Sequence, residues 1–283
     1  MIKACVVGWP ITHSRSPMIH GYWLKTLGID GSYEKLAVKP EDAFAFFQGL
    51  PGSGLTGCNV TVPLKEIAFE AADEKDSSAV AVGAANTIWI ENGKILAANT
   101  DTYGFMTHLS ATAPNWLDVD KPVLILGAGG AARAIAFGFL EAGIEQLMIS
   151  NRTKSRAEKL GEHFSKYRNK IRIVDWDNRS SAAAKAGVIV NTTTIGMRNE
   201  GSLDLDFSQV DSTTVVADIV YVPLETQLLK DARQRGLKTV DGLGMLLHQA
   251  VPGFEKWFGR RPDVTPELRA LIVGDLEAAA ASL

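Results

Sequence analysis

The feature that most constrains the fold is a glycine-rich run that joins an apolar strand to a helix. Residues 122–126 are predicted to form a buried strand, the run Gly127-Ala128-Gly129-Gly130-Ala131-Ala132 follows directly, and a helical pattern continues to Ala142. Glycine lets the backbone approach a pyrophosphate, and the helix N-terminus offers free N–H groups and a positive dipole end. The dinucleotide fingerprint accepts an alanine in its third position. In this strand-to-helix context, dinucleotide binding is favoured over a turn that only packs helix against strand.

The next predicted strand narrows the choice of cofactor. NAD sites usually have an Asp or Glu about twenty residues past the glycines, where it binds the ribose 2′-OH. Here the strand at residues 147–150 is followed by Asn151-Arg152-Thr153-Lys154-Ser155-Arg156, a segment without an acid. Guanidinium and hydroxyl groups bind a 2′-phosphate, which a carboxylate would repel. The alternative is that Arg152 and Arg156 are solvated charges at the start of a helix, but cations are unfavourable at a helix N-terminus. The sequence therefore predicts NADP as the cofactor.

Strand and helix patterns alternate in two series, which implies parallel strands joined by helical crossovers. Strands are predicted at residues 2–8, 33–38, 55–61, 122–126, 147–150, 171–174, 188–191, 215–218 and 238–240. Helices are predicted at residues 16–27, with Ser16 as the cap and Pro17 in the first turn, and at residues 40–50, 245–258 and 266–281. Residues 88–90 and 95–98 flank Asn92-Gly93 and are predicted to form a hairpin.

These patterns predict an α/β protein built from two α/β domains. A chain of 283 residues is long enough for one large domain or two ordinary ones. We expect a substrate-binding and catalytic domain with a mainly parallel sheet at residues 1–103 and a Rossmann-like NADP-binding domain at residues 104–243. The helices at residues 244–283 are expected to pack back on the first domain.

Composition argues against several classes of protein. The chain is 46% hydrophobic and 22% charged, with a net charge of −3, so it has no basic footprint for nucleic acid or an anionic membrane. No apolar stretch approaches the roughly 20 residues of a membrane span, and the start lacks the pattern of a signal peptide. The two cysteines, Cys5 and Cys58, make neither a disulfide framework nor a zinc site. We expect a cytoplasmic protein without a metal site.

A second segment carries groups suited to acid–base chemistry. Residues 57–65 (GCNVTVPLK) are predicted to form a short strand, after which Pro63 and Lys65 open a helix. Thr61 and Lys65 then lie outside the carboxyl end of a strand, where open α/β sheets bind ligands. Asp101, in the downstream segment Asn99-Thr100-Asp101, could set the charge state of Lys65. The alternative for a single such lysine is a solvated surface residue.

Taken together, the motifs resemble the shikimate dehydrogenase family over essentially the whole chain. Each motif alone is weakly specific, whereas their joint order is very specific. The matching segments are residues 8–17 (GWPITHSRSP), 57–65, 83–87 (GAANT), 99–104 (NTDTYG), 127–132, 151–153 (NRT), 191–193 (NTT), 218–221 (DIVY) and 241–245 (DGLGM), with Gln249.

The resemblance implies reversible NADPH-dependent reduction of 3-dehydroshikimate to shikimate, on the route to chorismate and the aromatic amino acids. By this similarity, Lys65 and Asp101 form the catalytic pair. The substrate-binding residues it implies are Ser14, Ser16, Thr61, Asn86, Asp101, Tyr221 and Gln249. The cofactor-binding residues it implies are Gly127, Ala128, Gly129, Gly130, Ala131, Asn151, Arg152, Thr153, Lys154, Ser155, Arg156, Ile219 and Gly242.

Two alternatives remain open at this point. A quinate/shikimate dehydrogenase would have the same fold and chemistry with a broader choice of substrate, although the missing acid argues against an NAD-preferring form. A non-catalytic sensor of shikimate or nucleotide would be favoured by loss of Lys65 or Asp101, and both are present. The expected partner is a small-molecule substrate, with no nucleic acid or membrane, and the protein is expected to be a monomer or homodimer.

Overall fold

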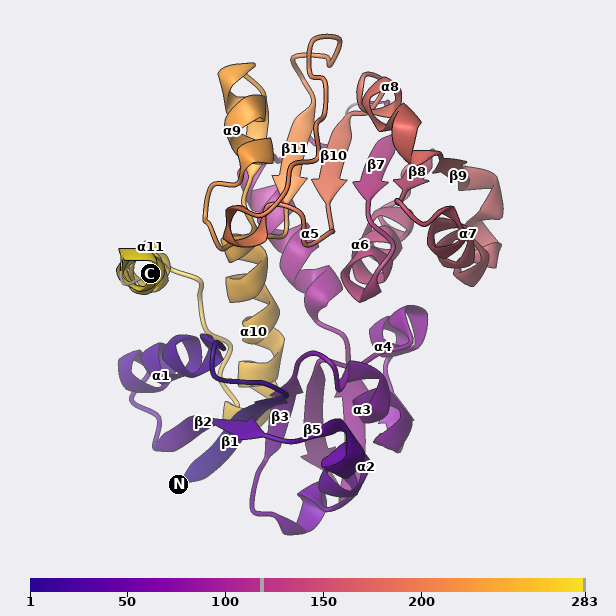
Figure 1. Ribbon diagram of the computed structural model, residues 1–283. Coiled ribbons are helices and arrows are strands. Elements are labelled where there is room, and N and C mark those ends of the chain that lie inside the picture. The colour runs from indigo at the N-terminus through magenta and orange to yellow at the C-terminus, as the bar shows by residue number, and fades with distance from the viewer. Residues whose placement is uncertain (118–119, 282–283) are drawn as a thin grey trace. The chain divides into compact units, whose positions relative to one another are not determined.

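The computed structural model describes residues 1–117 and 120–281 and divides into two compact units (Figure 1). Unit 1 comprises Met1–Thr102 and Leu247–Leu283, and unit 2 comprises Tyr103–Leu246. The chain leaves unit 1 near the start of α5 (Asp101–Thr112) and re-enters it within α10 (Gly242–Phe258). Among the described residues, no helix combines the length and apolarity needed to cross a membrane.

Unit 1 is built on a mixed six-stranded sheet with the order β2-β1-β3-β5-β6-β4. The strands β1, β2 and β3 run parallel, and the hairpin of β5 and β6 is added antiparallel to β3. The strands are β1 (Ile2–Gly8), β2 (Gly31–Ala37), β3 (Gly57–Val60), β4 (Glu74–Lys75), β5 (Thr87–Glu91) and β6 (Lys94–Ala98). The helices are α1 (Ser16–Thr26), α2 (Pro40–Gln48), η1 (Leu50–Gly52), α3 (Lys65–Ala71), α4 (Ser77–Val82) and α11 (Pro266–Ala281).

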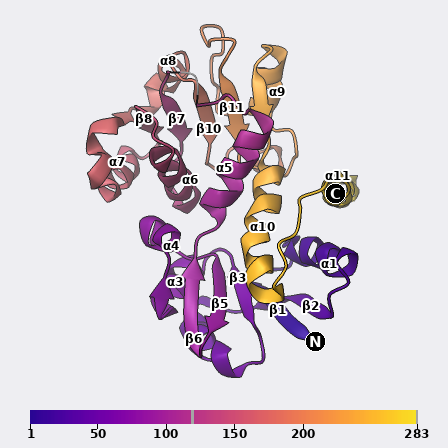
Figure 2. The same cartoon turned by 180° about the vertical axis from the view of Figure 1, so that it is seen from behind.

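The two faces of this sheet bury different side chains because neighbouring residues of a strand point to opposite sides. Cys5, Val7 and Cys58 belong to the core cluster that also contains residues of α2 and α3. The other face is aromatic: α1 and the C-terminal half of α10 supply Trp23, Phe254 and Trp257 around the buried His20. The ribbons of α1 and of the end of α10 lie beside β1 and β2 in Figure 2.

Unit 2 is built on an all-parallel six-stranded sheet with the order β12-β11-β10-β7-β8-β9. Numbered within the unit this is 3-2-1-4-5-6 from the β9 edge, the order of dinucleotide-binding α/β folds. The strands are β7 (Val123–Leu126), β8 (Leu147–Ser150), β9 (Ile171–Val174), β10 (Val188–Asn191), β11 (Val215–Asp218) and β12 (Lys238–Val240). The helices are α6 (Gly130–Glu141), α7 (Lys154–His163), η2 (Ser165–Lys170), η3 (Trp176–Asn178), α8 (Arg179–Ala183), η4 (Met197–Asn199) and α9 (Gln227–Gln234).

The fold class and the strands predicted from the sequence are therefore confirmed, whereas one helix cap and two helix starts differ. Arg15, and not Ser16, is the residue that precedes the first turn of α1. The Ser16 N–H donates a hydrogen bond to the Ser14 hydroxyl at 3.3 Å, so the side-chain acceptor lies earlier in the chain than predicted. Pro63 lies in a turn closed by a bond from Leu64 N to Thr61 O, and α3 begins only at Lys65. The helix α10 begins at Gly242, three residues early, because Asp241 Oδ1 accepts the Gly244 N–H at 3.2 Å.

The buried His20 predicts a pH dependence of stability. Its ring stacks on Tyr33 with centroids 3.9 Å apart, and burial lowers the pKa of His20 to about 3. The unfolded chain takes up this proton below its ordinary pKa of 6.5, whereas the folded protein does not. The contribution of the neutral His20 to the free energy of unfolding is therefore fully present above about pH 6.5. It is lost as the pH falls toward 3, by up to about 1.4 kcal/mol per pH unit.

His20→Phe should keep the ring stacking and flatten this part of the pH profile. Urea unfolding midpoints at about pH 7, 6 and 5, on both sides of the ordinary histidine pKa, measure the effect. His13→Phe, at an exposed position, is the matched control and should keep the wild-type slope. An equal slope in His20→Phe and the wild-type protein would show that other groups cause the acid sensitivity.

The glycine loop of unit 2 gives a second stability prediction. Gly127 has a φ of +116°, and a Cβ there would lie 2.5 Å from Thr192 Oγ1, which itself donates to Leu126 O. Gly129 has a φ of −92°, and a Cβ there would meet nothing within 4 Å. Gly127→Ala should lower the free energy of unfolding by more than about 1 kcal/mol, whereas Gly129→Ala should have little effect. Urea unfolding without nucleotide tests this, and equal losses would contradict it.

Candidate active site

The centre of the candidate site in unit 1 is an ion pair between the first residues of two helices. Lys65 begins α3 and Asp101 begins α5, where a carboxylate also interacts favourably with the helix dipole. Lys65 Nζ lies 2.5 Å from Asp101 Oδ2, and Lys65 remains partly exposed while Asp101 is buried. The structure thus brings together the two residues predicted to be the catalytic pair, although they are 36 positions apart in the chain.

Asn86 connects this pair to the helix α10. Its Nδ2 donates to Asp101 Oδ1 at 2.8 Å and lies 3.4 Å from Gln249 Oε1. Its Oδ1 accepts from the Thr100 backbone N–H at 2.8 Å, which fixes the orientation of the amide. Thr100 Oγ1 in turn donates to the backbone oxygen of Gln249 at 2.8 Å. The structure therefore brings Lys65, Asp101, Asn86 and Gln249 into one hydrogen-bonded group.

Sequence reasoning missed the buried polar residues behind this group. Asn59 on β3 donates to the backbone oxygen of Asn86 at 3.2 Å and to Thr87 Oγ1 at 3.3 Å. The hydroxyl of Tyr33 on β2 donates to Asn59 Oδ1 at 2.6 Å. Burial raises the pKa of Tyr33 well above its ordinary value, so its hydroxyl stays protonated as a donor. Asn59 is a lone polar residue in an apolar strand, which could have revealed this group from the sequence. A buried asparagine normally has hydrogen-bond partners, so it indicates further polar residues nearby.

The remaining predicted substrate residues of unit 1 lie in the segments that follow β1 and β3. These strands are parallel neighbours with Val7 opposite Val60, so their carboxyl ends meet at one edge. Thr61 directly follows β3, while Ser14 and Ser16 lie at the entry to α1. Ser16 is buried, and its backbone N–H donates to the Ser14 hydroxyl at 3.3 Å.

In unit 2 the glycine loop forms an open cradle at the N-terminus of α6. Gly127 directly follows β7, and its N–H donates to Ser150 O at 2.8 Å. Ala128 is half-buried and Ala131 lies in the first turn of α6. Added Cβ atoms at Gly129 and Gly130 would both point into open space. The free N–H groups of this helix end are therefore accessible to a pyrophosphate.

The segment after β8 supplies positive charge beside this loop. Asn151 Nδ2 donates to Thr153 O at 2.8 Å, and Thr153 precedes the first turn of α7, which includes Lys154, Ser155 and Arg156. In the described ranges, 1–117 and 120–281, neither Arg152 nor Arg156 takes part in an ion pair. The open cradle and the two unpaired guanidinium groups fit the pyrophosphate and 2′-phosphate of NADP.

Ile219, Tyr221 and Gly242 also belong to unit 2. A Cβ on Gly242 would lie 2.3 Å from the backbone oxygen of Ile219, so glycine is required for this close approach. Ile219 and Tyr221 are half-buried. They follow Asp218, which accepts hydrogen bonds from Thr226, Asn191 and the Val220 N–H. Burial raises the pKa of Asp218 to about 6 despite these donors.

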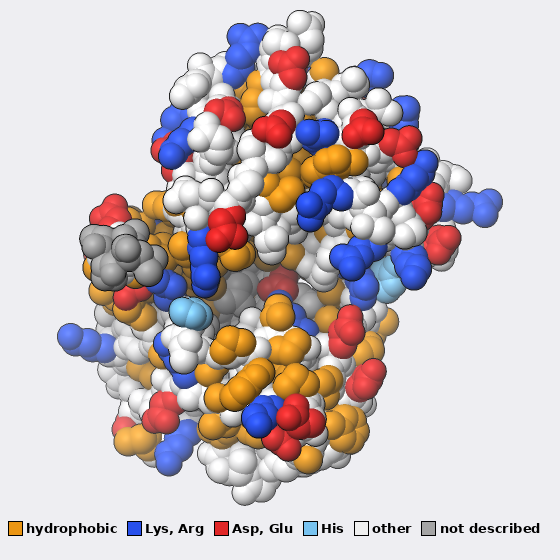
Figure 3. Space-filling view, viewed as in Figure 1, with side chains coloured by type: hydrophobic (Ala, Val, Ile, Leu, Met, Phe, Trp, Pro, Cys, Tyr) orange, Lys and Arg blue, Asp and Glu red, His pale blue; other side chains and the backbone are white. Residues whose placement is uncertain are grey.

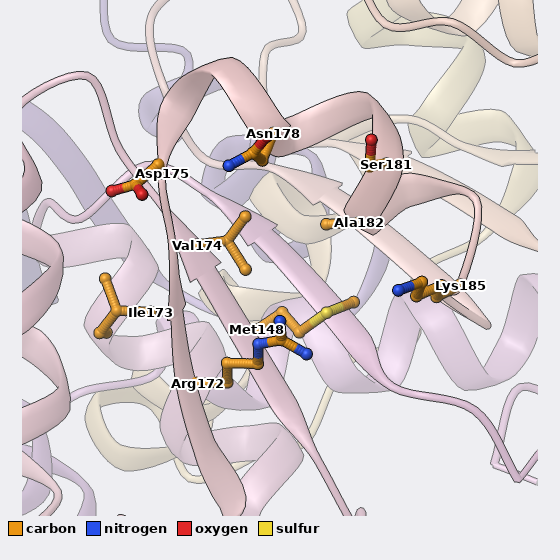
Figure 4. A pocket seen from close by; sticks show the side chains of 9 residues that line it. All are labelled: Met148, Arg172, Ile173, Val174, Asp175, Asn178, Ser181, Ala182 and Lys185. Carbon is orange, nitrogen blue, oxygen red and sulfur yellow. The ribbon is translucent and has the colours of Figure 1, made fainter.

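A pocket of about 240 Å³ lies elsewhere in unit 2, beside β8, β9 and α8 (Figure 4). Its lining includes Arg172, Asp175 and Lys185, and none of the residues predicted to bind substrate or cofactor. Over the face of unit 2 seen in Figure 3, acidic and basic side chains are interspersed. The pocket is thus lined by other residues than those predicted to bind substrate or cofactor.

Family models match most of the chain. Residues 6–88 match the shikimate dehydrogenase substrate binding domain, residues 113–221 the shikimate/quinate 5-dehydrogenase domain, and residues 242–271 the shikimate 5′-dehydrogenase C-terminal domain. The chain is similar to curated proteins named shikimate dehydrogenase (NADP(+)) from Azorhizobium caulinodans and Brucella canis. The first is 51% identical over 278 residues, covering 98% of both chains. The second is 51% identical over 282 residues, covering 99% of this chain and 96% of the relative.

Solved structures with the same fold include several with bound nucleotide. Shikimate 5-dehydrogenase from Thermus thermophilus, in complex with NADP(H) and shikimate, has a TM-score of 0.84 and is 34% identical, covering 98% of this chain and 100% of the other. Quinate dehydrogenase from Corynebacterium glutamicum, in complex with NAD, has a TM-score of 0.88 and is 29% identical, covering 96% of this chain and 99% of the other. The sequence motifs, the two α/β units and these similarities agree, and the chain belongs to the shikimate dehydrogenase family.

Proposed function

We propose that this protein catalyses the reversible NADPH-dependent reduction of 3-dehydroshikimate to shikimate, within the biosynthesis of chorismate and the aromatic amino acids. The observation that carries the proposal is the Lys65–Asp101 pair at 2.5 Å, with Asn86 and Gln249 beside it. A lysine held by a carboxylate is a proton donor, and the amides around it are suited to bind hydroxyl groups. The matches to relatives named NADP-dependent shikimate dehydrogenase support the assignment.

We assign substrate binding and cofactor binding to different domains. We assign residues 1–103 to substrate binding and catalysis, residues 104–243 to NADP binding, and the helices of residues 244–283 to support of the first domain. Gln249 supports the last assignment because it bonds Asn86 and Thr100 of unit 1. We also propose a cytoplasmic protein that acts as a monomer or homodimer.

NADPH, when bound, supplies the hydride that reduces the carbonyl carbon. Negative charge then develops on the carbonyl oxygen, and the Lys65 ammonium is positioned to donate a proton to it. Asp101 holds that ammonium in place, and Asn86 fixes Asp101 by donating to its second oxygen. In the oxidation of shikimate, the neutral lysine amine would accept the proton from the substrate hydroxyl.

Substrate recognition is assigned to the groups around this pair. Thr61, Asn86, Asp101 and Gln249 would bind the ring hydroxyls, and the hydroxyls of Ser14 and Ser16 would bind the carboxylate, with Tyr221 contributing to the same end. The fixed amide of Asn86 supports this, because preorganised donors lose little freedom on binding.

Cofactor recognition is assigned to the open cradle and the segment after β8. The backbone of Gly127, Ala128, Gly129, Gly130 and Ala131 would hold the pyrophosphate at the N-terminus of α6. The side chains of residues 151–156 would hold the 2′-phosphate. Ile219 and Gly242, which are in close contact with each other, would border the nicotinamide.

A broader quinate/shikimate dehydrogenase is the second candidate function. It is favoured by the structural similarity to the NAD-bound quinate dehydrogenase of Corynebacterium glutamicum. The absorbance of the reduced nicotinamide follows the reaction directly. Shikimate and quinate, each with NADP and with NAD, separate the two functions. Turnover with none of these pairs, together with nucleotide binding, would indicate the non-catalytic sensor.

Removal of the lysine amine should abolish most of the activity. Lys65→Met keeps the length of the side chain but has no amine, so kcat for shikimate oxidation should fall by roughly 100- to 10,000-fold, the usual worth of general acid–base catalysis. Asp101→Asn should also lower kcat, because the ammonium loses its charged partner. Since the two groups act as one unit, the double variant should lose less than the product of the single losses.

Steady-state kinetics of the four proteins, with shikimate binding measured separately by calorimetry, test this prediction. Lys94→Met is the matched control, because Lys94 forms an exposed ion pair with Glu74 outside the site and should keep wild-type kcat. Near-normal kcat in Lys65→Met, or strictly multiplicative losses, would assign the proton transfer to another group.

Arg152 should distinguish the two nicotinamide cofactors. A charge-assisted contact with phosphate contributes on the order of 1.5–3 kcal/mol, so Arg152→Ala should weaken NADPH binding by roughly tenfold or more. NADH, which lacks the 2′-phosphate, should bind nearly as before. Fluorescence titration with both nucleotides measures the ratio. Equal losses for both cofactors would contradict a role of Arg152 at the 2′-phosphate.

A further inference from the structure

An ion pair joins the proposed 2′-phosphate segment to the neighbouring strand of unit 2. Lys154, the first residue of α7, places its Nζ 2.8 Å from Oδ1 of Asp175, which directly follows β9. The strands β8 and β9 are parallel neighbours with Ser150 opposite Val174. The segments that leave these two residues therefore start side by side at the same edge of the sheet.

This pairing gives Lys154 a different electrostatic environment from the two arginines near it. Arg152 and Arg156 form no ion pair within the described part of the chain, whereas Lys154 is already neutralised by a carboxylate. Asp175 raises the pKa of Lys154 through its hydrogen bond and charge. The lysine is therefore a cation, but its ammonium points at Asp175.

The carboxylate of Asp175 is directed away from the other cations of its pocket. Figure 4 shows it turned away from Arg172 and Lys185, which line the same pocket. The side chains of Lys154 and Asp175 are 57% and 56% exposed, so packing does not lock the pair. Removal of the carboxylate would leave Lys154 free to turn toward an anion bound beside Arg152 and Arg156.

We propose that Asp175 limits the preference of this protein for NADP over NAD by holding the Lys154 ammonium away from the 2′-phosphate. The inference rests on the proposed function, because it takes residues 151–156 as the 2′-phosphate segment. The acid that acts on this segment is thus Asp175, which follows β9, the third strand of unit 2. No acid directly follows β8, the second strand, where NAD sites usually have one. Asp175 is a specificity-determining residue through Lys154 and takes no part in the chemical step.

Calorimetric titration of the full chain with NADPH, NADH and 2′,5′-ADP tests the proposal. Asp175→Asn should tighten NADPH and 2′,5′-ADP by about three- to tenfold, less than the effect expected for Arg152 because an exposed lysine makes a weaker contact, and should leave NADH unchanged. The gain should disappear in the Asp175→Asn/Lys154→Gln double variant. Asp177→Asn removes the same charge from an exposed neighbour whose side chain forms no hydrogen bond or ion pair with the described residues, and should produce a much smaller change.

Three results would overturn the proposal: NADPH affinity of Asp175→Asn that is unchanged or lower, a gain equal to that of Asp177→Asn, or a full gain that persists without Lys154. The last result would mean that the carboxylate acts by direct repulsion. Wild-type protein that binds neither nicotinamide nucleotide would instead refute the proposed function. Wild-type protein that binds NADPH and oxidises shikimate, with no shift in the variants, would refute this inference alone.

Discussion

The parallel direction of neighbouring strands is the constraint on which the functional groups of each unit depend. A helical crossover returns the chain to the same end of the sheet, so successive strands finish at one edge. In unit 1 this places Thr61 and the start of α3 beside the end of β1. In unit 2 it places the glycine loop, the segment after β8 and Asp175 along one edge. Residues distant in sequence become neighbours without any specific contact between their side chains being required.

Asn86 then converts this proximity into a defined geometry. Its oxygen accepts from Thr100 and its nitrogen donates to Asp101, so the amide cannot rotate without loss of both bonds. Asn59 and Tyr33 support it from the interior of the sheet. Unpartnered polar groups would be costly at this depth, and a fully bonded network is rigid for the same reason. The proposed catalytic pair of Lys65 and Asp101 thus depends on the buried residues Asn59 and Tyr33 behind it.

The charged groups of the proposed cofactor site in unit 2 differ from this buried network because they are exposed. The cradle at α6 offers backbone N–H groups whose direction is set by the helix. The cations of residues 151–156 lie on flexible side chains, and one of them is already engaged by Asp175. Exposed ion pairs contribute little to stability, which leaves such a pair free to tune selectivity at a small cost to the fold.

The sequence alone determined the fold class and every strand except the short β4, and it predicted most residues of the candidate site. Buried parallel strands are short apolar runs bounded by glycine or polar residues, so β7 to β12 could be predicted from local pattern. The motifs also identified Lys65, Asp101 and the glycine loop. The cap at Ser16 and the helix start at Pro63 were wrong because capping depends on backbone angles that tertiary contacts set. Only the tertiary structure revealed Asn59 behind Asn86 and Asp175 beside Lys154, because sheet order, and not sequence spacing, decides which strand ends become neighbours.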